Sequence, residues 1–519
     1  METSTTAISE STASGGSTIF TPTGEATAIL PAREAYLTPI TVIGTETIRG
    51  TFDALCIKQA LNSRAAPGVT QLVLNPDAHC GYGAPIGCVM VSPTHIYPGP
   101  VGVDIKCSMS LLQTNIPENA IKDAPTRRAI IHAITQRVPT GAGRGQRSVA
   151  KSRYVGPSLG KQAVLEGASS SVLQQLGIPT HWALHCEDSH HLGHDGSPEA
   201  LAQRFDRLTT MHGSRLADKF SQLGSYGGGN HFGECEIVQV REGKQDIADA
   251  FGLRHGHAAF LSHCGSRGFG FQLANFQFRT LQAQFAKWGT PFPAGDKELV
   301  YAPLGTPEAD AYLDDMALGA NYATINHLLI NALVLEAFQE ILPGTIGSLV
   351  YFISHNIARQ EPTDVRLING KLIQCSPASA WVHRKGATRA LPAGHPSLAG
   401  TPFEHVGHPI LLPGDPQSGS SVMVAAPGAE KSCYSVNHGA GRMKGRKAAI
   451  REFDQAAINR SFDEADILTN CRNYPMDEAP AAYKDFSEVI NSVQLAGLAT
   501  EVARLRARFV IKDADKADD

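Results

Sequence analysis

TPEADAYLDDMALGANYATINHLLINALVLEAFQEIL, residues 306–342, predicts the scaffold of the protein because it has the pattern of one very long helix. Thr306 is a suitable N-cap, and the Pro-Glu pair after it suits a first helical turn. Apolar residues recur at helical spacing from Ala317 to Leu333. Asn321 and His327 interrupt any run of about 18 apolar residues, so the segment is predicted to be core and not a membrane span.

Around this segment, short strands alternate irregularly with helices, without a regular βαβ pattern. This mixture predicts an α+β fold, and we expect one large domain over residues 31–512 with its site in a central cleft. Residues 1–30 are rich in Ser and Thr and have neither a basic start nor an apolar core, which predicts a disordered tail and not a secretory signal. Residues 513–519 are predicted to be a frayed acidic end.

Composition excludes some classes of partner. The formal net charge is −4 and charged residues make up 18% of the 519, so a nucleic acid would have to bind a local basic groove. The ten cysteines lack the density and spacing of a secreted disulfide scaffold and are read as reduced thiols. These features predict a soluble, cytoplasmic protein.

KSCYSVNHGAGRMKGRKAAI, residues 431–450, places His438 before a Gly-Ala-Gly turn and a run of basic residues. Such a turn lets backbone N–H groups face an anion, and Arg442 and Arg446 add charge that suits a phosphate. We interpret His438 as a nucleophile toward a nucleotide phosphate. The alternative is a loop histidine that caps a helix.

Candidate metal ligands stand at the ends of predicted strands. Asp104 and Cys107 are three residues apart and can converge on one ion, although a buried cysteine beside a turn aspartate is an alternative. His231 follows a Gly-rich turn, and His263 and His355 end apolar strands. Together these five residues form a plausible binuclear set of N, O and S ligands.

Other segments are less specific. The predicted strand 71–74 opens into DAHCGYGAPIG, where Asp77 and His79 could belong to a site or where Asp77 could simply make a turn. The histidines of residues 181–195 are predicted to be incidental ones on an exposed loop. Residues 382–394 form a predicted basic glycine loop, and residues 483–508 are predicted to be a helix followed by a short strand that carries Lys512.

Ten segments, in one order from about Asp77 to Lys512, resemble the RtcB family of GTP-dependent RNA-splicing ligases. They are PDAHCGYGAPIG, PVGVDIKC, GGGNHF, SHCGSRGFG, GANYATINH, HNIA, HRKGATRALPAG, PGDPQSGSS, NHGAGR and VARLRARFVIK. The resemblance implies an enzyme that joins an RNA 2′,3′-cyclic phosphate or 3′-phosphate to a 5′-hydroxyl end, with GTP and two manganese ions. It also implies tRNA halves or cleaved RNA as partners, and an activating protein such as archease.

The resemblance assigns roles to residues. His438 would carry GMP, pass it to the RNA 3′-phosphate and lose it when the 5′-hydroxyl attacks, with Asp77 near the acceptor. The implied metal ligands are Asp104, Cys107, His231, His263 and His355, with the cysteine bridging both ions. The implied GTP contacts are Asn230, His231, Phe232, Gly233, Glu234, His355, Asn356, Pro413, Gly414, Asp415, Pro416, Ser420, His438, Gly439, Ala440, Gly441 and Lys512. The basic segments imply RNA contacts by Arg384, Lys385, Arg389, Arg442 and Arg446.

The sequence departs from the family pattern at two places beside the nucleotide pocket: Pro416-Gln417 replaces a Met-Gly pair, and Gly233 replaces a bulky apolar residue. Two other functions remain open. One is a phosphohydrolase that uses the same binuclear centre with water as the nucleophile. The other is a non-catalytic RNA-binding relative.

Overall fold

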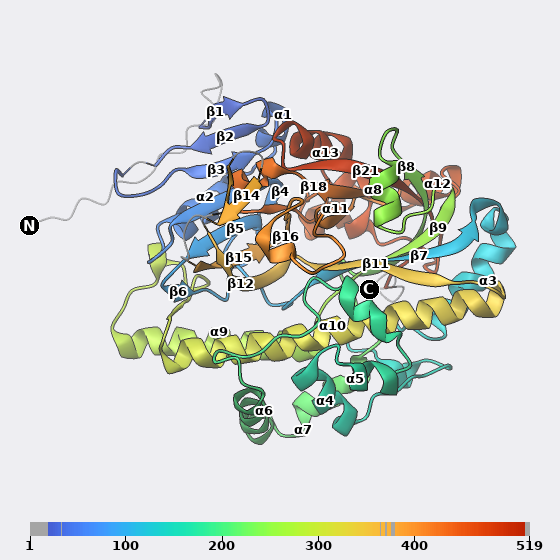
Figure 1. Ribbon diagram of the computed structural model, residues 1–519, viewed down its shortest axis with the longest axis horizontal. Helices are drawn as coiled ribbons and strands as arrows, with labels where there is room; N and C mark the ends of the chain where they lie inside the picture. Colours follow the sequence, from blue (N-terminus) through green and yellow to red (C-terminus); the bar gives the residue numbers. More distant parts are fainter. Residues whose placement is uncertain (1–18, 33, 364, 369–370, 375–378, 514–519) are drawn as a thin grey trace, which may run out of the picture.

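The computed structural model describes residues 19–513, apart from residues 33, 364, 369–370 and 375–378. Two mixed β-sheets face each other, and a layer of helices packs beside them (Figure 1). The first sheet has the order β1 (Thr21–Gly24), β2 (Thr27–Leu30), β3 (Ile40–Ile43), β4 (Gln71–His79), β5 (Ile86–Ser92), β15 (Ser379–Lys385), β12 (Asn356–Pro362). The second has the order β11 (Gly347–Ser354), β7 (Ser108–Pro117), β9 (His257–Cys264), β8 (Phe232–Val240), β21 (Ala499–Ile511), β18 (Ser420–Ala425), β17 (Pro409–Pro413), and β20 (Leu468–Thr469) pairs with β21.

The remaining elements are short strand pairs and helices. The pairs are β6 (His95–Ile96) with β10 (Ala302–Pro303), β13 (Val365–Ile368) with β14 (Lys371–Gln374), and β16 (Ala387–Arg389) with β19 (Ser435–Asn437). The helices are α1 (Glu46–Arg49), α2 (Ala54–Arg64), α3 (Ala124–Thr135), α4 (Pro157–Glu166), α5 (Ser170–Gln175), α6 (Pro198–His212), α7 (Ser214–Ala217), α8 (Gln245–Ala250), α9 (Arg267–Trp288), α10 (Pro307–Ile341), α11 (Arg446–Glu452), α12 (Gln455–Glu464) and α13 (Phe486–Leu495). The predicted α+β class, in a single domain, is confirmed.

Alternate residues of a strand face opposite sides of its sheet, so one strand contributes to two hydrophobic cores. In β4, Val73 joins a core that also contains Leu111 of β7 and Leu261 of β9, so this core lies between the two sheets. Leu72 and Leu74, on the other face of β4, pack into a second core beside α2. A strand that is buried on both faces reads as a continuous apolar run, which is the pattern of QLVL.

The long helix predicted for residues 306–342 is confirmed as α10, and the Thr306 side chain accepts a hydrogen bond from Ala309 N. The helix packs against α3, α4 and α9 and contacts three strands of the second sheet. Its buried polar residues bind neighbouring loops. Asn326 accepts from Gly224 N at 2.8 Å and donates to Gly265 O at 3.0 Å, so it joins the loops that precede β8 and follow β9.

Two predicted boundaries differ from the structure. The predicted C-terminal helix over residues 483–508 is wrong: α13 ends at Leu495, and residues 499–511 form β21. In RLRARF the arginines alternate with Leu505, Ala507 and Phe509, which is a period of two and therefore a strand pattern. The ordered domain also begins before residue 31, because β1 and β2 pair as a hairpin and bury Ala28 and Leu30.

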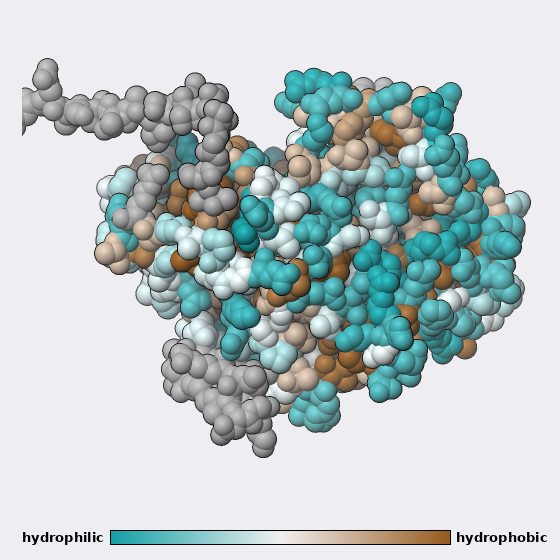
Figure 2. Space-filling model, turned by 90° about the horizontal axis from the view of Figure 1, so that it is seen from above, coloured by the Kyte–Doolittle hydropathy of each residue, from teal (hydrophilic) through white to brown (hydrophobic). Residues whose placement is uncertain are grey.

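The predicted strand over residues 71–74 is also longer than expected, because β4 continues through Asn75 and Pro76 to His79. The exposed surface is mainly hydrophilic on the face shown in Figure 2, where apolar groups form scattered patches. None of the helices in the described part of the chain combines the length and the apolar composition that a membrane crossing needs.

Replacing Asn326 with alanine should destabilise the fold, because the change leaves several buried backbone groups of two loops without partners. Each such group costs about 1–3 kcal/mol. We expect the apparent melting temperature in a thermal scan to fall by several degrees. Asn491→Ala, on an exposed face of α13, should leave it unchanged; equal melting of the two variants would contradict this role of Asn326.

Candidate metal centre and active site

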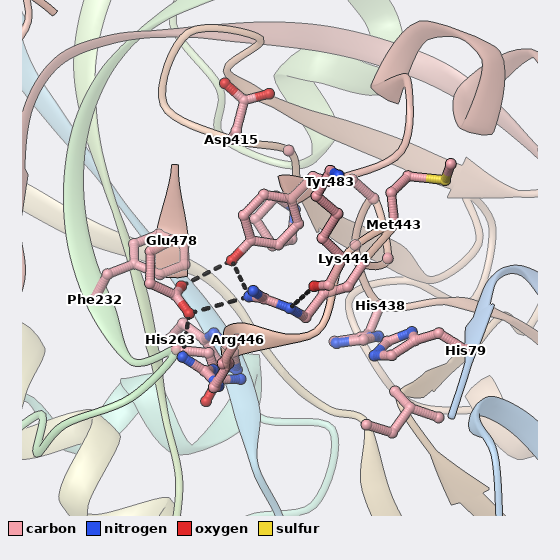
Figure 3. A pocket seen from close by; sticks show the side chains of 18 of the residues that line it. His79, Phe232, His263, Asp415, His438, Met443, Lys444, Arg446, Glu478 and Tyr483 are labelled. Atoms are coloured by element: carbon pink, nitrogen blue, oxygen red, sulfur yellow. Dashed lines mark hydrogen bonds and ion pairs between the residues drawn. The ribbon is translucent and has the colours of Figure 1, made fainter. Parts of the chain in front are cut away.

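A cavity of about 500 Å³ lies between the ends of the two sheets and collects most of the candidate site (Figure 3). The second sheet contributes residues of β8 and β21 and of the loop between β17 and β18. The first sheet contributes His79 and Ile86, from the end of β4 and the start of β5. The turn that carries His438 lines the space between them.

The five predicted metal ligands converge at one edge of the second sheet. The strands β11, β7, β9 and β8 are antiparallel neighbours, so the starts of β7 and β8 meet the ends of β9 and β11 there. Cys107 Sγ lies 3.2 Å from His263 Nε2 and 3.5 Å from His231 Nε2. His231 Nε2 in turn lies 2.9 Å from an oxygen of Asp104.

These ligand atoms form two overlapping trios, and both contain Cys107. The trios are Asp104, Cys107 and His231, and Cys107, His263 and His355. Within each trio the candidate ligand atoms lie within 4.8 Å of one another. Imidazole, carboxylate and thiolate in such an arrangement are donors for a divalent metal ion, and a shared sulfur can bridge two sites.

The surroundings of the trios fit a metal ion. Tyr226 O lies 2.9 Å from His231 Nδ1, which fixes the proton on that nitrogen and turns the lone pair of Nε2 toward the cluster. The buried Nδ1 of His355 has no hydrogen-bond partner among the described residues, and an ion would satisfy it. Gly265 leaves room for the carboxylate, because a Cβ there would lie 2.5 Å from Asp104 Oδ1.

His438 is held beside this cluster by a buried carboxylate. Its Nδ1 lies 2.7 Å from Asp77 Oδ2 and 2.9 Å from the carbonyl oxygen of Gly386. Both oxygens are acceptors, so the neutral ring must carry its proton on Nδ1 and keep a lone pair on Nε2. The His438 ring also lies 4.6 Å, centre to centre, from that of His355. An imidazole ring with a free lone pair on Nε2 therefore lies next to one of the candidate metal ligands.

Lys484 joins the two segments that carry Asp77 and His438. Its Nζ donates to the carbonyls of Pro76 and Ala78 at 2.9 and 2.8 Å, on either side of Asp77. Its backbone N donates to Gly441 O at 2.9 Å, in the turn after His438. Gly441 has φ +77° and touches the backbone of Asp77, where a Cβ would lie 2.4 Å from its carbonyl oxygen. The turn must therefore have glycine at this position.

The part of the cavity formed by the second sheet is a recess that contains a buried carboxyl group. Phe232 and Tyr474 line it, and Oε1 of the buried Glu234 has no hydrogen-bond partner among the described residues. Burial, together with Glu236 and Asp415, raises the pKa of Glu234 well above its usual range. A ligand with N–H donors would satisfy this carboxyl group.

Most of the predicted nucleotide contacts line the cavity: Asn230, Phe232, Glu234, Pro413, Gly414, Asp415, Pro416, His438, Gly439, Ala440, Gly441 and Lys512. His231, Gly233, His355, Asn356 and Ser420 lie outside its lining. Gly233 packs on the opposite side of β8, where a Cβ would lie 2.4 Å from Tyr226 Oη. Tyr226 therefore fills the space that a bulky residue would take at position 233, so the glycine does not change the shape of the recess.

Three predicted RNA contacts are not in a solvated loop. Arg384 and Lys385 lie in β15 and Arg389 in β16. The buried guanidinium of Arg384 donates to both oxygens of Glu361 at 2.7 and 2.8 Å, and Lys385 donates to the carbonyls of Tyr82 and Ala84. The prediction that these basic residues lie in a loop was wrong. The residues that pair with them lie on segments distant in sequence.

The other two predicted RNA contacts line the cavity but are also paired. Arg442 lies 3.2 Å from Glu478, and Arg446 lies 2.5 Å from the same residue (Figure 3). Arg446 also lies 2.6 Å from Asp477. Glu478 also binds Lys512 at 2.8 Å. Burial would raise the pKa of Glu478, but Lys512 and the arginines lower it to about 2. Glu478 therefore stays ionised and fixes these cations.

The segment 181–195 is only partly the exposed loop that was predicted, because His181, His190 and His194 are exposed but part of the segment is buried. Glu187 is buried, accepts from Ser354 N at 3.0 Å and pairs with Arg359 at the same distance. His191 Nε2 lies 2.8 Å from Lys106 Nζ. None of its histidines belongs to either ligand trio found among the described residues. The segment instead supports the strand end that precedes His355.

Sequence reasoning missed several residues of the site, including Tyr474, Glu478 and Lys484. They lie in NYPMDEAPAAYK, which shows neither helical nor strand periodicity and belongs to none of the recognised motifs. The acidic pair Asp477-Glu478 was the one sequence feature that could have predicted a partner for the basic residues after His438. Gly386 acts through its carbonyl oxygen, which no sequence pattern reveals.

A cluster of metal-binding side chains beside an oriented histidine defines a metal-binding enzyme in which that histidine can act as a nucleophile. Residues 59–513 match the family model described as tRNA-splicing ligase RtcB. Proteins named tRNA-splicing ligase RtcB from Thermococcus kodakarensis and Aeropyrum pernix are each 33% identical to this chain, over 88% of it and 90% of their own lengths. The chain therefore belongs to the RtcB family of ligases, and the predicted resemblance is confirmed.

Replacing Cys107 with alanine should weaken the binding of a divalent ion by at least about 100-fold, because both trios lose their shared sulfur. Equilibrium dialysis with Mn²⁺ or Co²⁺ measures this. Cys235→Ala is the matched control, since Cys235 is buried in the same sheet and belongs to neither trio. Unchanged binding by Cys107→Ala would exclude the shared-sulfur site.

Proposed function

We propose that the protein joins RNA ends carrying a 2′,3′-cyclic phosphate or 3′-phosphate to 5′-hydroxyl ends, through a GMP–His438 intermediate formed from GTP. The observation that supports this most is the orientation of His438, whose Nδ1 is held by Asp77 while its Nε2 is left as the nucleophilic nitrogen beside the metal ligands. The names of its relatives support RNA, with tRNA halves or cleaved RNA as the proposed substrates.

In this proposal His438 Nε2 attacks the α-phosphorus of GTP and pyrophosphate leaves. The ring becomes positively charged as the N–P bond forms, and the buried carboxylate of Asp77 stabilises that charge through Nδ1–H, much as a triad carboxylate does. Two Mn²⁺ ions held by the five ligands would neutralise phosphate charge and orient the α-phosphate. The GMP then passes to the RNA 3′-phosphate, and the 5′-hydroxyl displaces it.

Glu234 supports guanine as the base. Guanine presents N–H donors at N1 and at its 2-amino group, whereas adenine has an acceptor at N1. The unpartnered carboxyl group of Glu234 lies in a recess that Phe232 and Tyr474 also line, and it matches the guanine edge. Two N–H donors of guanine would stabilise its ionised form and so lower the pKa that burial raises, whereas the acceptor at N1 of adenine would not. An adenine in the recess would leave the carboxylate buried and unpaired.

The basic residues that line the cavity also support RNA as a partner. Lys444 and Arg446 line the rim of the cavity and would contact RNA phosphates, so binding should weaken with salt. The free thiol of Cys107 suits a reducing compartment such as the cytoplasm. A phosphohydrolase that uses water is less favoured, because it gives no role to the oriented nitrogen of His438.

Incubation with α-³²P-GTP and Mn²⁺ should label the wild-type protein, and the label should be lost with acid and survive alkali, as a phosphoramidate does. His438→Ala should take up no label, because the variant lacks the imidazole nitrogen that attacks the α-phosphorus in this proposal. His257→Asn, which changes a histidine outside the cavity, should label like wild type. Equal labelling of wild type and His438→Ala would contradict the intermediate.

Glu234→Gln should reduce the preference for GTP over ATP by about 10- to 100-fold, the range that corresponds to losing a charged hydrogen-bond acceptor of roughly 1.5–3 kcal/mol. The measurement compares initial rates of protein labelling with α-labelled GTP and ATP. Glu242→Gln, on an exposed turn, serves as the control. An unchanged ratio would show that Glu234 does not read the base.

A further inference from the structure

His79, in the DAHCGYG segment, has no part in the proposed reaction, yet it lines the same cavity as His438. It ends β4, two residues after Asp77. The two histidines bind opposite parts of that aspartate, since His438 holds the carboxylate and His79 Nδ1 lies 2.8 Å from the backbone carbonyl oxygen. Figure 3 shows the two rings in one part of the pocket, away from Phe232 and Asp415.

The hydrogen bond of His79 fixes its tautomer. A carbonyl oxygen accepts only, so Nδ1 must carry the proton, and the neutral ring keeps its lone pair on Nε2. Burial lowers the pKa of His79 to about 4, an effect that the carbonyl and carboxylate of Asp77 only partly offset. The ring is therefore neutral at physiological pH and can accept a proton.

The position of His79 assigns it to the RNA half of the cavity. The nucleotide recess is built from the second sheet, whereas Asp53, His79, Cys80 and Ile86 line the opposite part and come from the first sheet or the residue before α2. His438 lies on the same side as His79, and the two rings are neighbours in Figure 3. A group that reacts with the activated phosphate from the side opposite the guanosine would therefore approach past His79.

We propose that His79 is the general base of the joining step and accepts the proton of the RNA 5′-hydroxyl at Nε2. The O5′–H bond breaks and its proton moves to Nε2. The oxygen then forms a bond to the RNA 3′-phosphorus, and the bond from that phosphorus to the oxygen bridging to GMP breaks. GMP leaves with the electron pair, and the imidazolium returns its proton to solvent. This inference rests on the proposed function, of which it describes the last step.

The test separates the three chemical steps in single-turnover reactions with Mn²⁺, α-³²P-GTP, an RNA that ends in a 3′-phosphate and a second RNA with a 5′-hydroxyl. His79→Asn should form protein–GMP and guanylylated RNA at rates within about twofold of wild type. Joining should slow by about 10²–10⁴-fold, the usual contribution of a general base, so that guanylylated RNA accumulates. Added imidazole should restore part of the joining rate of His79→Ala.

His257→Asn is the matched control, because His257 Nδ1 makes the same bond to the carbonyl two residues earlier, at 2.8 Å, outside the cavity. It should join RNA like wild type. Joining by His79→Asn at the wild-type rate would overturn the inference, as would equal slowing of all three steps without rescue by imidazole in a variant that melts like wild type. If His79→Asn fails to fold, His79→Gln replaces it. Absence of protein–GMP in the wild type would instead overturn the proposed function.

Discussion

The hydrogen bond between Asp77 and His438 connects the first sheet to the turn that lines the cavity. Asp77 belongs to β4 of the first sheet, and His438 follows β19, whose turn leads into the wall of the nucleotide recess. A fully buried carboxylate is costly unless its oxygens are paired, and the ring of His438 satisfies one of them. The contact that stabilises the fold at this point is thus the same one that sets the tautomer of the nucleophile.

The metal cluster depends on sheet geometry and not on a local motif. Its ligands come from four antiparallel strands, and alternate strand starts and strand ends bring them to one edge. Helix α10 then fixes the loops on either side through Asn326. A site built this way is rigid, because three of the four strands, β7, β9 and β8, are hydrogen-bonded on both sides. This explains why so few of its residues are neighbours in sequence.

The long helix could be predicted because it depends on local periodicity, and the five candidate metal ligands could be named because each stands in a recognisable short motif, although only the sheets bring them together. The family was predicted from those motifs and confirmed by the comparisons. The failures have one physical origin. Arg384 reads as a basic loop residue until β12 brings Glu361 beside it, and Glu187 reads as surface until Ser354 and Arg359 enclose it. Charge pairs between distant segments leave no periodic trace in a sequence.

β21 occupies an interior position of the second sheet, between β8 and β18, although it follows every other described strand in the chain. During synthesis the ribosome therefore releases β8, β9 and the metal ligands long before the strand that must be inserted beside them, and Lys512 emerges later still. A nascent chain would have to keep a gap open in this sheet, with two unpaired edges exposed to other strands. Chains in which β8 and β18 have formed but β21 has not yet been inserted would be the ones that expose these edges.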